Sequence, residues 1–235
     1  LETLKILSRA SSVIAEGEVH QLVTANDTDT TEQDYLEVIQ AKTAKLFAAA
    51  AEIGAVVSNR PKIEQEALET FGNQIGMAFQ LIDDVLDYSA QQTTLGKAVG
   101  DDFRDGKITL PIILAFQAGD EEERLFWRRT LEDLEQKKGD FKRAVQYLEN
   151  SGALLATIER ARDYSRKALN SLSIFLVAPL CASHSSATRW SIIWSSTWVS
   201  SFITMVLSAP TIIFFARPRS EKFMIDRSSP VLCEK

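Results

Sequence analysis

Hydrophobic residues recur at helical spacing through roughly the first three quarters of the chain. Leu4, Leu7, Val13 and Ile14 begin such a pattern, which continues to Leu22. The same periodicity predicts further helices over residues 35–57, 63–88, 109–118, 121–138, 141–150 and 153–172. No alternating pattern of strand length interrupts them. The prediction is an all-α protein, with helices long enough for a large bundle.

Polar breaks and glycines refine this outline. Thr31, followed three residues later by Asp34, is typical of a capped helix start. Pro61 suits the first turn of the long helix that follows it. Gly72 and Gly76, four residues apart on that helix, indicate a close approach of a second helix.

Charge and composition change after residue 167. The residues before this point carry a net charge of −9 and those after it +3, which leaves −6 for the whole chain. Between residues 168 and 216 the only Asp, Glu, Lys or Arg is Arg189, and three of the four tryptophans lie in this stretch. We therefore expect a helical domain over residues 1–175. We expect residues 176–235 to form an atypical Ser/Trp-rich tail, weakly structured or membrane-associated.

The most apolar part of the tail raises the question of a membrane span. Residues 190–216 carry no charge and are long enough to cross a bilayer. Their serine content and Pro210 argue against a span, so a weakly structured or interfacial tail is the favoured interpretation.

Overall composition excludes several classes of protein. The hydrophobic fraction of 45% and the charged fraction of 25% are those of a soluble globular protein. The acidic net charge argues against a nucleic-acid partner, which would require a basic face. Cys181 and Cys233 have no metal-ligand spacing and form no disulfide framework, which favours a reducing compartment and a cytoplasmic location. The first residues lack the basic segment of a signal peptide.

Three carboxylates lie within the otherwise mostly apolar residues 79–88. On a helix, Asp83 and Asp87 fall one turn apart on nearly the same face, Asp84 lies about 100° from Asp83, and Gln80 precedes them by one turn. Carboxylates this close repel one another and are costly to bury unpaired. An oxygen-only cluster favours Mg²⁺ shared with substrate phosphates. A solvated acidic face is the alternative, but the apolar flanks weigh against it.

The residues after this helix combine lysines with further acids. Residues 93–107 are polar and glycine-bearing, which predicts a loop, and Lys97 and Lys107 flank a second acidic pair. Such lysines would neutralise the outer oxygens of a polyanionic substrate; a charged surface loop is the alternative. A calcium-binding loop is rejected, because its third and twelfth positions would be Phe103 and Ile112.

Two polar groups interrupt the first helices. Lys42 and Thr43 lie in an otherwise Ala-rich helix, where a lysine usually extends to solvent. Glu16-Gly17-Glu18, together with Gln21, forms a similar polar island on the first helix. The sequence contains no GxGxxG, Walker A or GxSxG motif.

Together these motifs resemble a known family. The run from Gly76 to Tyr88 resembles the second aspartate-rich motif, FQ-x-x-DD-x-x-D, of the trans-polyprenyl diphosphate synthases. Other segments of the family pattern are matched by Gly96-Lys97, Gly100-Asp101-Asp102, Gly106-Lys107-Ile108-Thr109-Leu110-Pro111 and Lys42-Thr43, while Gly17-Glu18 falls where many members have Gly-Gln. The resemblance covers residues 1–175. It is greatest to the octaprenyl/decaprenyl type, which makes ubiquinone side chains.

The resemblance implies a helical bundle of the isoprenoid synthase type and a head-to-tail condensation of isopentenyl diphosphate with an allylic diphosphate. It implies Mg²⁺ as cofactor and a homodimer in the complete enzyme. By position, the metal residues would be Asp83, Asp84 and Asp87, the last two as ligands or as support. Lys42, Lys97 and Lys107 would contact the substrate diphosphate, and Lys42, Thr43 and Gln80 would form the catalytic group.

The sequence also departs from the family pattern. The first aspartate-rich motif, the Gly-Lys-x-x-Arg segment before it and the Arg pair after it are not found, so we expect an N-terminally truncated chain with impaired activity. Beyond Phe175 the charged helical end of the family is replaced by the tail, which suggests translation out of the ancestral frame. Two alternatives stay open: a non-catalytic member acting as a binding or dimerisation subunit, and a terpene cyclase of the same fold, against which the loop at 96–111 argues.

Overall fold

The computed structural model describes residues 1–89 and 100–175, all within one compact unit. The described residues form helices joined by short turns and contain no strand, so the predicted all-α class is confirmed. The helices are α1 (Glu2–Thr24), α2 (Glu32–Ile39), η1 (Gln40–Ala44), α3 (Lys45–Val57), α4 (Lys62–Asp87), α5 (Asp101–Arg104), α6 (Leu110–Ala118), α7 (Glu121–Trp127), η3 (Arg128–Glu132), α8 (Asp140–Asn150), α9 (Ala153–Ser171) and η4 (Leu172–Phe175).

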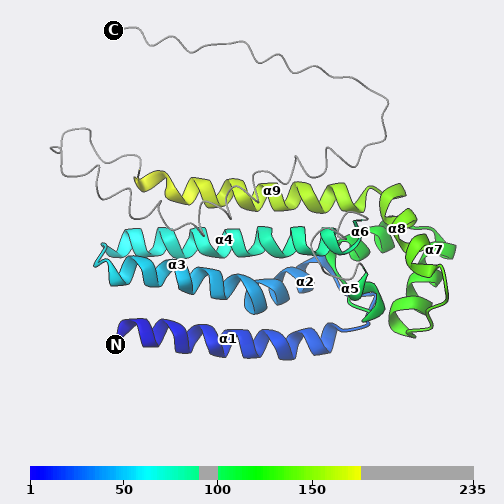
Figure 1. Ribbon diagram of the computed structural model, residues 1–235, viewed down its shortest axis with the longest axis horizontal. Helices are drawn as coiled ribbons and strands as arrows, with labels where there is room; N and C mark the ends of the chain where they lie inside the picture. Colours follow the sequence, from blue (N-terminus) through cyan, green and yellow to red (C-terminus); the bar gives the residue numbers. More distant parts are fainter. Residues whose placement is uncertain (90–99, 176–235) are drawn as a thin grey trace, which may run out of the picture. The chain divides into compact units, whose positions relative to one another are not determined.

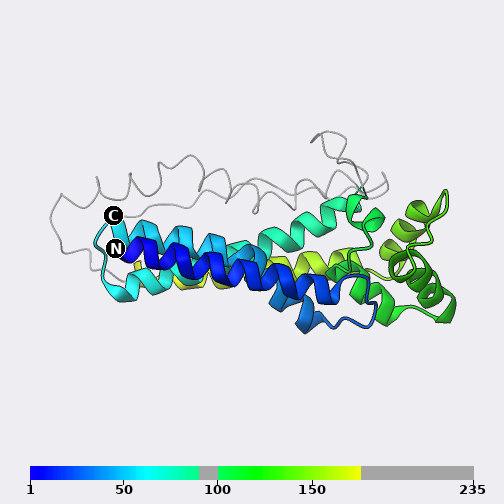
Figure 2. The same ribbon diagram turned by 90° about the horizontal axis from the view of Figure 1, so that it is seen from below.

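Four long helices form a row in which each packs on the next (Figure 1). α3 packs against α1 on one side and α4 on the other, and α4 packs in turn against α9. The shorter helices α5 to α8 gather where α4 ends and α9 begins, as the view from below also shows (Figure 2). The aspartate motif therefore lies at the end of α4 that meets these short helices.

The start of α2 follows the predicted capping motif. The backbone N–H of Asp34 donates to the Thr31 hydroxyl (3.2 Å), and the backbone N–H of Thr31 donates to the Asp34 carboxylate (3.1 Å). This reciprocal pair satisfies two N–H groups that have no partner inside the helix. The predicted helix start at Thr31 is confirmed.

The glycines of α4 allow the close packing that the sequence indicates. A Cβ atom on Gly76 would lie 2.5 Å from the Cα of Ala44, and one on Gly72 would lie 2.7 Å from the carbonyl carbon of Phe47. Neither position can accept a larger residue without moving backbone. The two glycines therefore set the distance between α4 and the helix formed by η1 and α3, which carries the Lys-Thr pair.

Of the three hydrophobic clusters among the described residues, the two larger ones lie beside the aspartate motif. One gathers around Trp127 and Tyr88 among the short helices, and the other around Tyr35 and Leu81 between α2, α4 and α9. α6 contributes buried residues to both clusters, and its sequence is apolar on all sides, as expected of a buried helix. α6 thus joins the end of α4 to the rest of the core.

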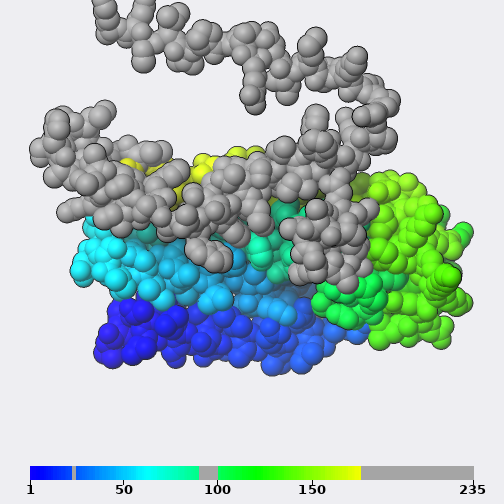
Figure 3. All heavy atoms as spheres, in the orientation of Figure 1, coloured from blue at the N-terminus to red at the C-terminus, as the bar shows by residue number. Residues whose placement is uncertain are grey.

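The outer side of α1 has no cover among the described residues. α1 forms the edge of the row (Figure 3), where Leu4, Val19 and Leu22 are exposed. Its inner side packs Ile6 and Ala10 against α3. α1 therefore carries apolar residues on its outer side as well as on its inner side.

Some predicted boundaries were wrong. The helix predicted over 121–138 ends at Glu132, because Leu134 takes a positive φ of 55° and the Gln136 side chain donates to the carbonyl oxygens of Phe103 (2.7 Å) and Thr130 (3.0 Å). These tertiary bonds replace further helical turns. The loop predicted over 93–107 contains the single-turn helix α5, and the helix predicted over 35–57 contains the π-helical segment η1.

The predictions for the tail fall on residues outside the described part of the chain. These include the division near residue 175, the apolar stretch at 190–216 and the weakly structured tail. Within residues 1–89 and 100–175, no helix combines the length and the hydrophobicity needed to cross a membrane.

Candidate functional site

Asp84 is the most deeply buried member of the aspartate motif, with 2% of its surface exposed. Its carboxylate accepts a short hydrogen bond from the Tyr35 hydroxyl on α2 and a second from Nε2 of Gln80 (2.9 Å), one turn earlier on α4. Burial raises the pKa of Asp84 to about 7, even though both hydrogen bonds favour the charged form. Asp84 is thus enclosed by protein groups.

The hydrogen bonds continue from Asp84 to the Lys-Thr pair. The hydroxyl of Thr43 donates to Oε1 of Gln80 (3.0 Å), while Nε2 of the same amide donates to Asp84. A connected chain of side chains therefore runs from Tyr35 through Asp84 and Gln80 to Thr43. Three of the residues predicted for the site are brought together in this way. Tyr35 was missed, because no spacing in the sequence relates a tyrosine on α2 to an aspartate 49 residues later.

Asp87 turns toward the segment that follows the helix. Its carboxylate accepts the backbone N–H of Asp102 (3.0 Å), and its backbone carbonyl accepts the N–H of Gly100 (3.0 Å). Burial, followed by the nearby charge of Asp102, raises the pKa of Asp87. Asp87 thereby fixes the start of α5 against the end of α4.

Asp83 is less buried than either neighbour in the motif. In the described ranges, no three His, Cys, Asp or Glu side chains are grouped to hold a metal ion by themselves. Mg²⁺, however, is usually bound by one or two carboxylates together with substrate phosphates and water. An oxygen-only motif with Asp83 at its surface fits one protein ligand of such a site. Asp84 and Asp87, whose oxygens contact protein donors, fit a supporting role.

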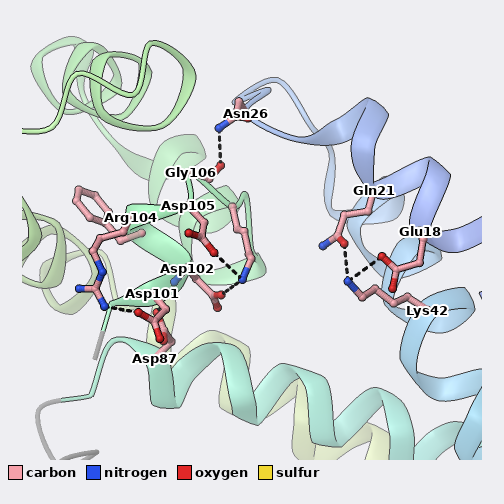
Figure 4. A network of polar contacts seen from close by, with 12 residues as sticks. Glu18, Gln21, Asn26, Lys42, Asp87, Asp101, Asp102, Arg104, Asp105 and Gly106 are labelled. Carbon is pink, nitrogen blue, oxygen red and sulfur yellow. Dashed lines mark hydrogen bonds and ion pairs between the residues drawn. The ribbon is translucent and has the colours of Figure 1, made fainter. Parts of the chain in front are cut away.

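Lys42 extends toward α1. Its Nζ lies 3.2 Å from the Glu18 carboxylate and 2.6 Å from Oε1 of Gln21 (Figure 4). The close approach of α1 depends on Gly17, where a Cβ atom would lie 2.9 Å from the Lys42 backbone nitrogen. The polar island on the first helix is thus the binding partner of Lys42.

The segment η1 explains why Lys42 and Thr43 reach different neighbours. Its five residues form a π-helix, which is wider than an α-helix and frequent at functional sites. Lys42 contacts α1, whereas Thr43 contacts α4. The sequence gives no signal for this segment, since its residues are ordinary helix formers.

Lys107 belongs to a separate acidic group. Its Nζ contacts the carboxylates of Asp102 (2.7 Å) and Asp105 (3.3 Å). Burial alone would lower the pKa of Lys107, but the bonds to these two aspartates raise it above its ordinary value. Lys107 is therefore charged and lies beside α5, whose start is bound to Asp87.

The turn that carries Lys107 is anchored to the end of α1. The side chain of Asn26 donates to the carbonyl oxygens of Gly106 (3.1 Å) and Leu131 (2.8 Å), the first of which appears in Figure 4. Asn26 itself has a positive φ of 59°, which asparagine adopts more readily than most residues. Lys97, the third predicted diphosphate ligand, lies outside the described residues.

A pocket of about 560 Å³ borders α1, α2, η1, α3 and α4 but includes none of the predicted site residues. Lys45 and Glu69, which form an ion pair at 3.1 Å, lie in its wall. This pocket is therefore distinct from the hydrogen-bonded chain at Asp84.

The polyprenyl synthetase family model matches residues 1–148. The chain belongs to this family. It is 40% identical over 177 residues to an octaprenyl diphosphate synthase of Haemophilus influenzae, covering 74% of this chain and 54% of that protein. The chain thus spans about half the length of the curated relatives it matches.

Solved structures support the same conclusion. A polyprenyl synthase from Caulobacter crescentus, complexed with calcium and isoprenyl diphosphate, has 49% identity and a TM-score of 0.72, over 74% of this chain and 53% of that one. A decaprenyl diphosphate synthase from Rhodobacter capsulatus has 43% identity and a TM-score of 0.69, over 73% and 53%. The predicted all-α isoprenoid synthase fold is confirmed.

Proposed function

We propose that this chain supplies the second aspartate wall and the Lys-Thr pair of a trans-polyprenyl diphosphate synthase. The reaction is the head-to-tail condensation of isopentenyl diphosphate with an allylic diphosphate to a long-chain product. The observation that carries the proposal is the connected chain Thr43–Gln80–Asp84, which joins the Lys-Thr pair to the aspartate motif across two packed helices. The similarity to octaprenyl and decaprenyl diphosphate synthases supports the long-chain assignment.

The charged residues of the site act on the substrate diphosphate. Asp83 provides a metal ligand, and Lys42, Lys97 and Lys107 provide positive charge for the substrate diphosphate. When bound, Mg²⁺ supplies further positive charge that stabilises the departing diphosphate. Fixed charges of this kind act without reorganisation as the carbon–oxygen bond breaks.

The Thr43–Gln80 pair acts on the other half of the substrate. As the allylic diphosphate ionises, positive charge develops on its carbon skeleton, and oxygen dipoles held in place beside it stabilise that charge. Thr43 and Gln80 fix each other through a 3.0 Å hydrogen bond, so their oxygens have a defined direction.

Side chains of α1 hold Lys42 in a weak ion pair. Glu18 and Gln21 lie 3.2 and 2.6 Å from its Nζ, and the side chain is 36% exposed. The ion pair is accessible to solvent and therefore weak. A diphosphate with several negative oxygens would therefore compete effectively for Lys42.

Two further parts of the proposal rest on the family resemblance: we assign the product to the ubiquinone side-chain type and the complete enzyme to a homodimer. The cysteine usage is the reason to assign the location to the cytoplasm. Membrane association through the tail is the alternative for location, and flotation of the purified protein with vesicles separates the two.

A binding experiment on the full chain tests the metal site. Mn²⁺, used in place of Mg²⁺, is titrated in the presence of inorganic diphosphate and followed by water-proton relaxation. We expect Asp83→Asn to weaken diphosphate-dependent Mn²⁺ binding at least tenfold, because a charged ligand is lost. Asp163→Asn, a change at an exposed aspartate paired with Arg166 on α9, serves as the control and leaves binding unchanged. Equal binding by both variants and the parent protein contradicts the assignment.

Product analysis decides between the proposed reaction and its alternatives. The protein is incubated with isopentenyl diphosphate, an allylic primer and Mg²⁺. Because the first aspartate-rich motif of the family is not found in this sequence, we expect the 235-residue chain alone to give very little elongation. Tight diphosphate binding with slow elongation supports the proposal that this chain forms half of a condensing site. Weak binding with no product supports a non-catalytic subunit, and cyclic hydrocarbon products support a terpene cyclase.

A further inference from the structure

Tyr35 reaches the aspartate motif from a different helix. It lies on α2, is 5% exposed and packs in the same hydrophobic cluster as Leu81 and Leu110. Its hydroxyl donates to the Asp84 carboxylate. Burial raises the pKa of Tyr35 well above its ordinary value, so this hydroxyl keeps its proton and acts as a hydrogen-bond donor.

Asp84 has two donors and two oxygens, and each donor is assigned to one of them. Tyr35 bonds Oδ2 and Gln80 bonds Oδ1. The orientation of the carboxylate plane therefore depends on both partners. If the tyrosine hydroxyl is removed, Asp84 keeps only the bond from its own helix and is free to turn about its side-chain torsions.

The amide of Gln80 transmits this orientation. Its Nε2 donates to Asp84 and its Oε1 accepts from Thr43, so each end of the amide is defined by a different partner. A change at Asp84 therefore alters the direction of Gln80, and with it the position of the Thr43 hydroxyl. Since Thr43 is half-buried on η1, the effect reaches the segment that also carries Lys42.

We propose that Tyr35 is a positioning residue of the metal–diphosphate site, acting through Asp84 on Gln80 and Thr43. Its hydroxyl holds the carboxylate that faces the interior, which leaves Asp83 to face the metal. The inference rests on the proposed function, because it names what the site needs in order to bind Mn²⁺ or Mg²⁺ with diphosphate.

Tyr35→Phe tests the proposal in the full-length chain, since it removes one oxygen and keeps the ring. We expect diphosphate-dependent Mn²⁺ binding to weaken about tenfold, the effect of losing one hydrogen bond to a charged group. Tyr164→Phe is the matched control. It makes the same chemical change at a tyrosine packed against the same cluster, on α9, and leaves binding unchanged. Urea unfolding of each variant checks that both remain folded.

A spectroscopic readout follows Gln80 directly. In protein labelled with ¹⁵N-glutamine, the side-chain amide resonance of Gln80, assigned by its loss in Gln80→Met, shifts in Tyr35→Phe and stays in place in Tyr164→Phe. Thr43→Val removes the far end of the hydrogen-bonded chain while keeping the side-chain shape, and it shifts the same resonance and weakens binding. If Tyr35→Phe does not fold, this second variant still tests whether the hydrogen-bonded chain at Gln80 positions the site.

Combination with Asp84→Asn separates positioning from packing. If Tyr35 acts through Asp84, Tyr35→Phe weakens Mn²⁺ binding no further in the Asp84→Asn background. The inference is wrong if the losses of Mn²⁺ affinity in Tyr35→Phe and Asp84→Asn are fully additive. It is also wrong if the Gln80 amide resonance keeps its position in both Tyr35→Phe and Thr43→Val. If the parent protein binds Mn²⁺ with diphosphate and Tyr35→Phe binds equally well, the inference alone fails. If the parent protein binds neither Mn²⁺ nor diphosphate, the proposed function fails together with the inference about Tyr35.

Discussion

Replacement of Gly72 by alanine should destabilise the protein, although alanine is the better helix former. Alanine gains about 1 kcal/mol over glycine in a helix interior. At Gly72, however, the added Cβ would lie 2.7 Å from the Phe47 carbonyl carbon and 2.8 Å from the Ala48 Cα. Both are backbone atoms of α3 and cannot rotate away, so α3 and α4 must separate. Overpacking of this kind costs about 1–3 kcal/mol, and contacts with backbone rather than side-chain atoms place Gly72→Ala at the upper end.

The net effect is a loss of about 1–2 kcal/mol in the free energy of unfolding. For a chain of this size, that lowers the melting temperature by roughly 2–8 °C. Thermal unfolding followed by circular dichroism at 222 nm measures the shift.

Gly54 offers a matched control on α3. A Cβ atom there would meet nothing within 4 Å, so Gly54→Ala gains the helix propensity without a clash. It should stabilise the protein by about 1 kcal/mol and raise the melting temperature by roughly 2–4 °C. If Gly72→Ala proves as stable as Gly54→Ala, the close approach of α3 and α4 does not control the packing, and the reasoning fails.

Three further predictions concern buried and paired groups. The pKa of Asp84 is raised from 3.8 to about 7, so the folded protein binds this proton more tightly than the unfolded chain does, and the resulting stability is complete below pH 4 and lost as the pH rises to about 7. Urea unfolding should therefore give a free energy of unfolding that is lower at pH 8 than at pH 4, by a difference on the order of 4 kcal/mol that Asp84→Asn lacks. Asn26→Ala removes two hydrogen bonds to carbonyl oxygens and leaves alanine at a positive φ, which should cost about 2–4 kcal/mol by urea unfolding. Arg160→Gln breaks the two-point contact with Glu32 that joins α9 to α2; since both side chains are about a third exposed, the loss should be about 0.5–1 kcal/mol and should shrink in high salt.

Each of these predictions has its own control or contrary outcome. Asn59 also has a positive φ (52°) but an exposed side chain, so Asn59→Ala should cost only the backbone part, about 1 kcal/mol. Equal losses at Asn26 and Asn59 would show that the hydrogen bonds of Asn26 contribute little. A parallel pH dependence in Asp84→Asn and the parent protein would contradict the assignment of the proton to Asp84. A loss at Arg160 that does not respond to salt would point to packing rather than charge.

Most of the helical outline could be predicted, because each long helix has an apolar stripe and its own start or stop signal. Thr31 and Asp34 form the expected capping pair, and Gly72 and Gly76 make the expected close contact. The end of the helix at Glu132 could not be predicted, since it depends on bonds from Gln136 to residues elsewhere in the fold. Local sequence does not contain this information.

The candidate site, like the fold, could be predicted only in part. The helical period places Asp83, Asp84 and Asp87 on one arc, but it does not tell which of them faces the interior. Which aspartate faces the interior depends on what α4 packs against. Here the hydroxyl of Tyr35, on another helix, donates a hydrogen bond to Asp84 and holds it there. The partners of Lys42 on α1 were likewise recognisable only as an isolated polar group, because nothing in the sequence says that two helices meet at Gly17.

The π-helical segment η1 also makes the chain unusually sensitive to its length at one point. A π-turn accommodates one residue more than an α-turn, so removing a single residue from Gln40–Ala44 would restore a regular α-helix. Because the wide turn absorbs the extra residue, α2 and α3 would keep their relative directions, and Tyr35 would still reach Asp84. The segment itself would change, since Lys42 and Thr43 reach α1 and α4 from adjacent positions of the wide turn. Deletion of Ala41 should therefore damage the site more than the fold, although it removes neither Lys42 nor Thr43.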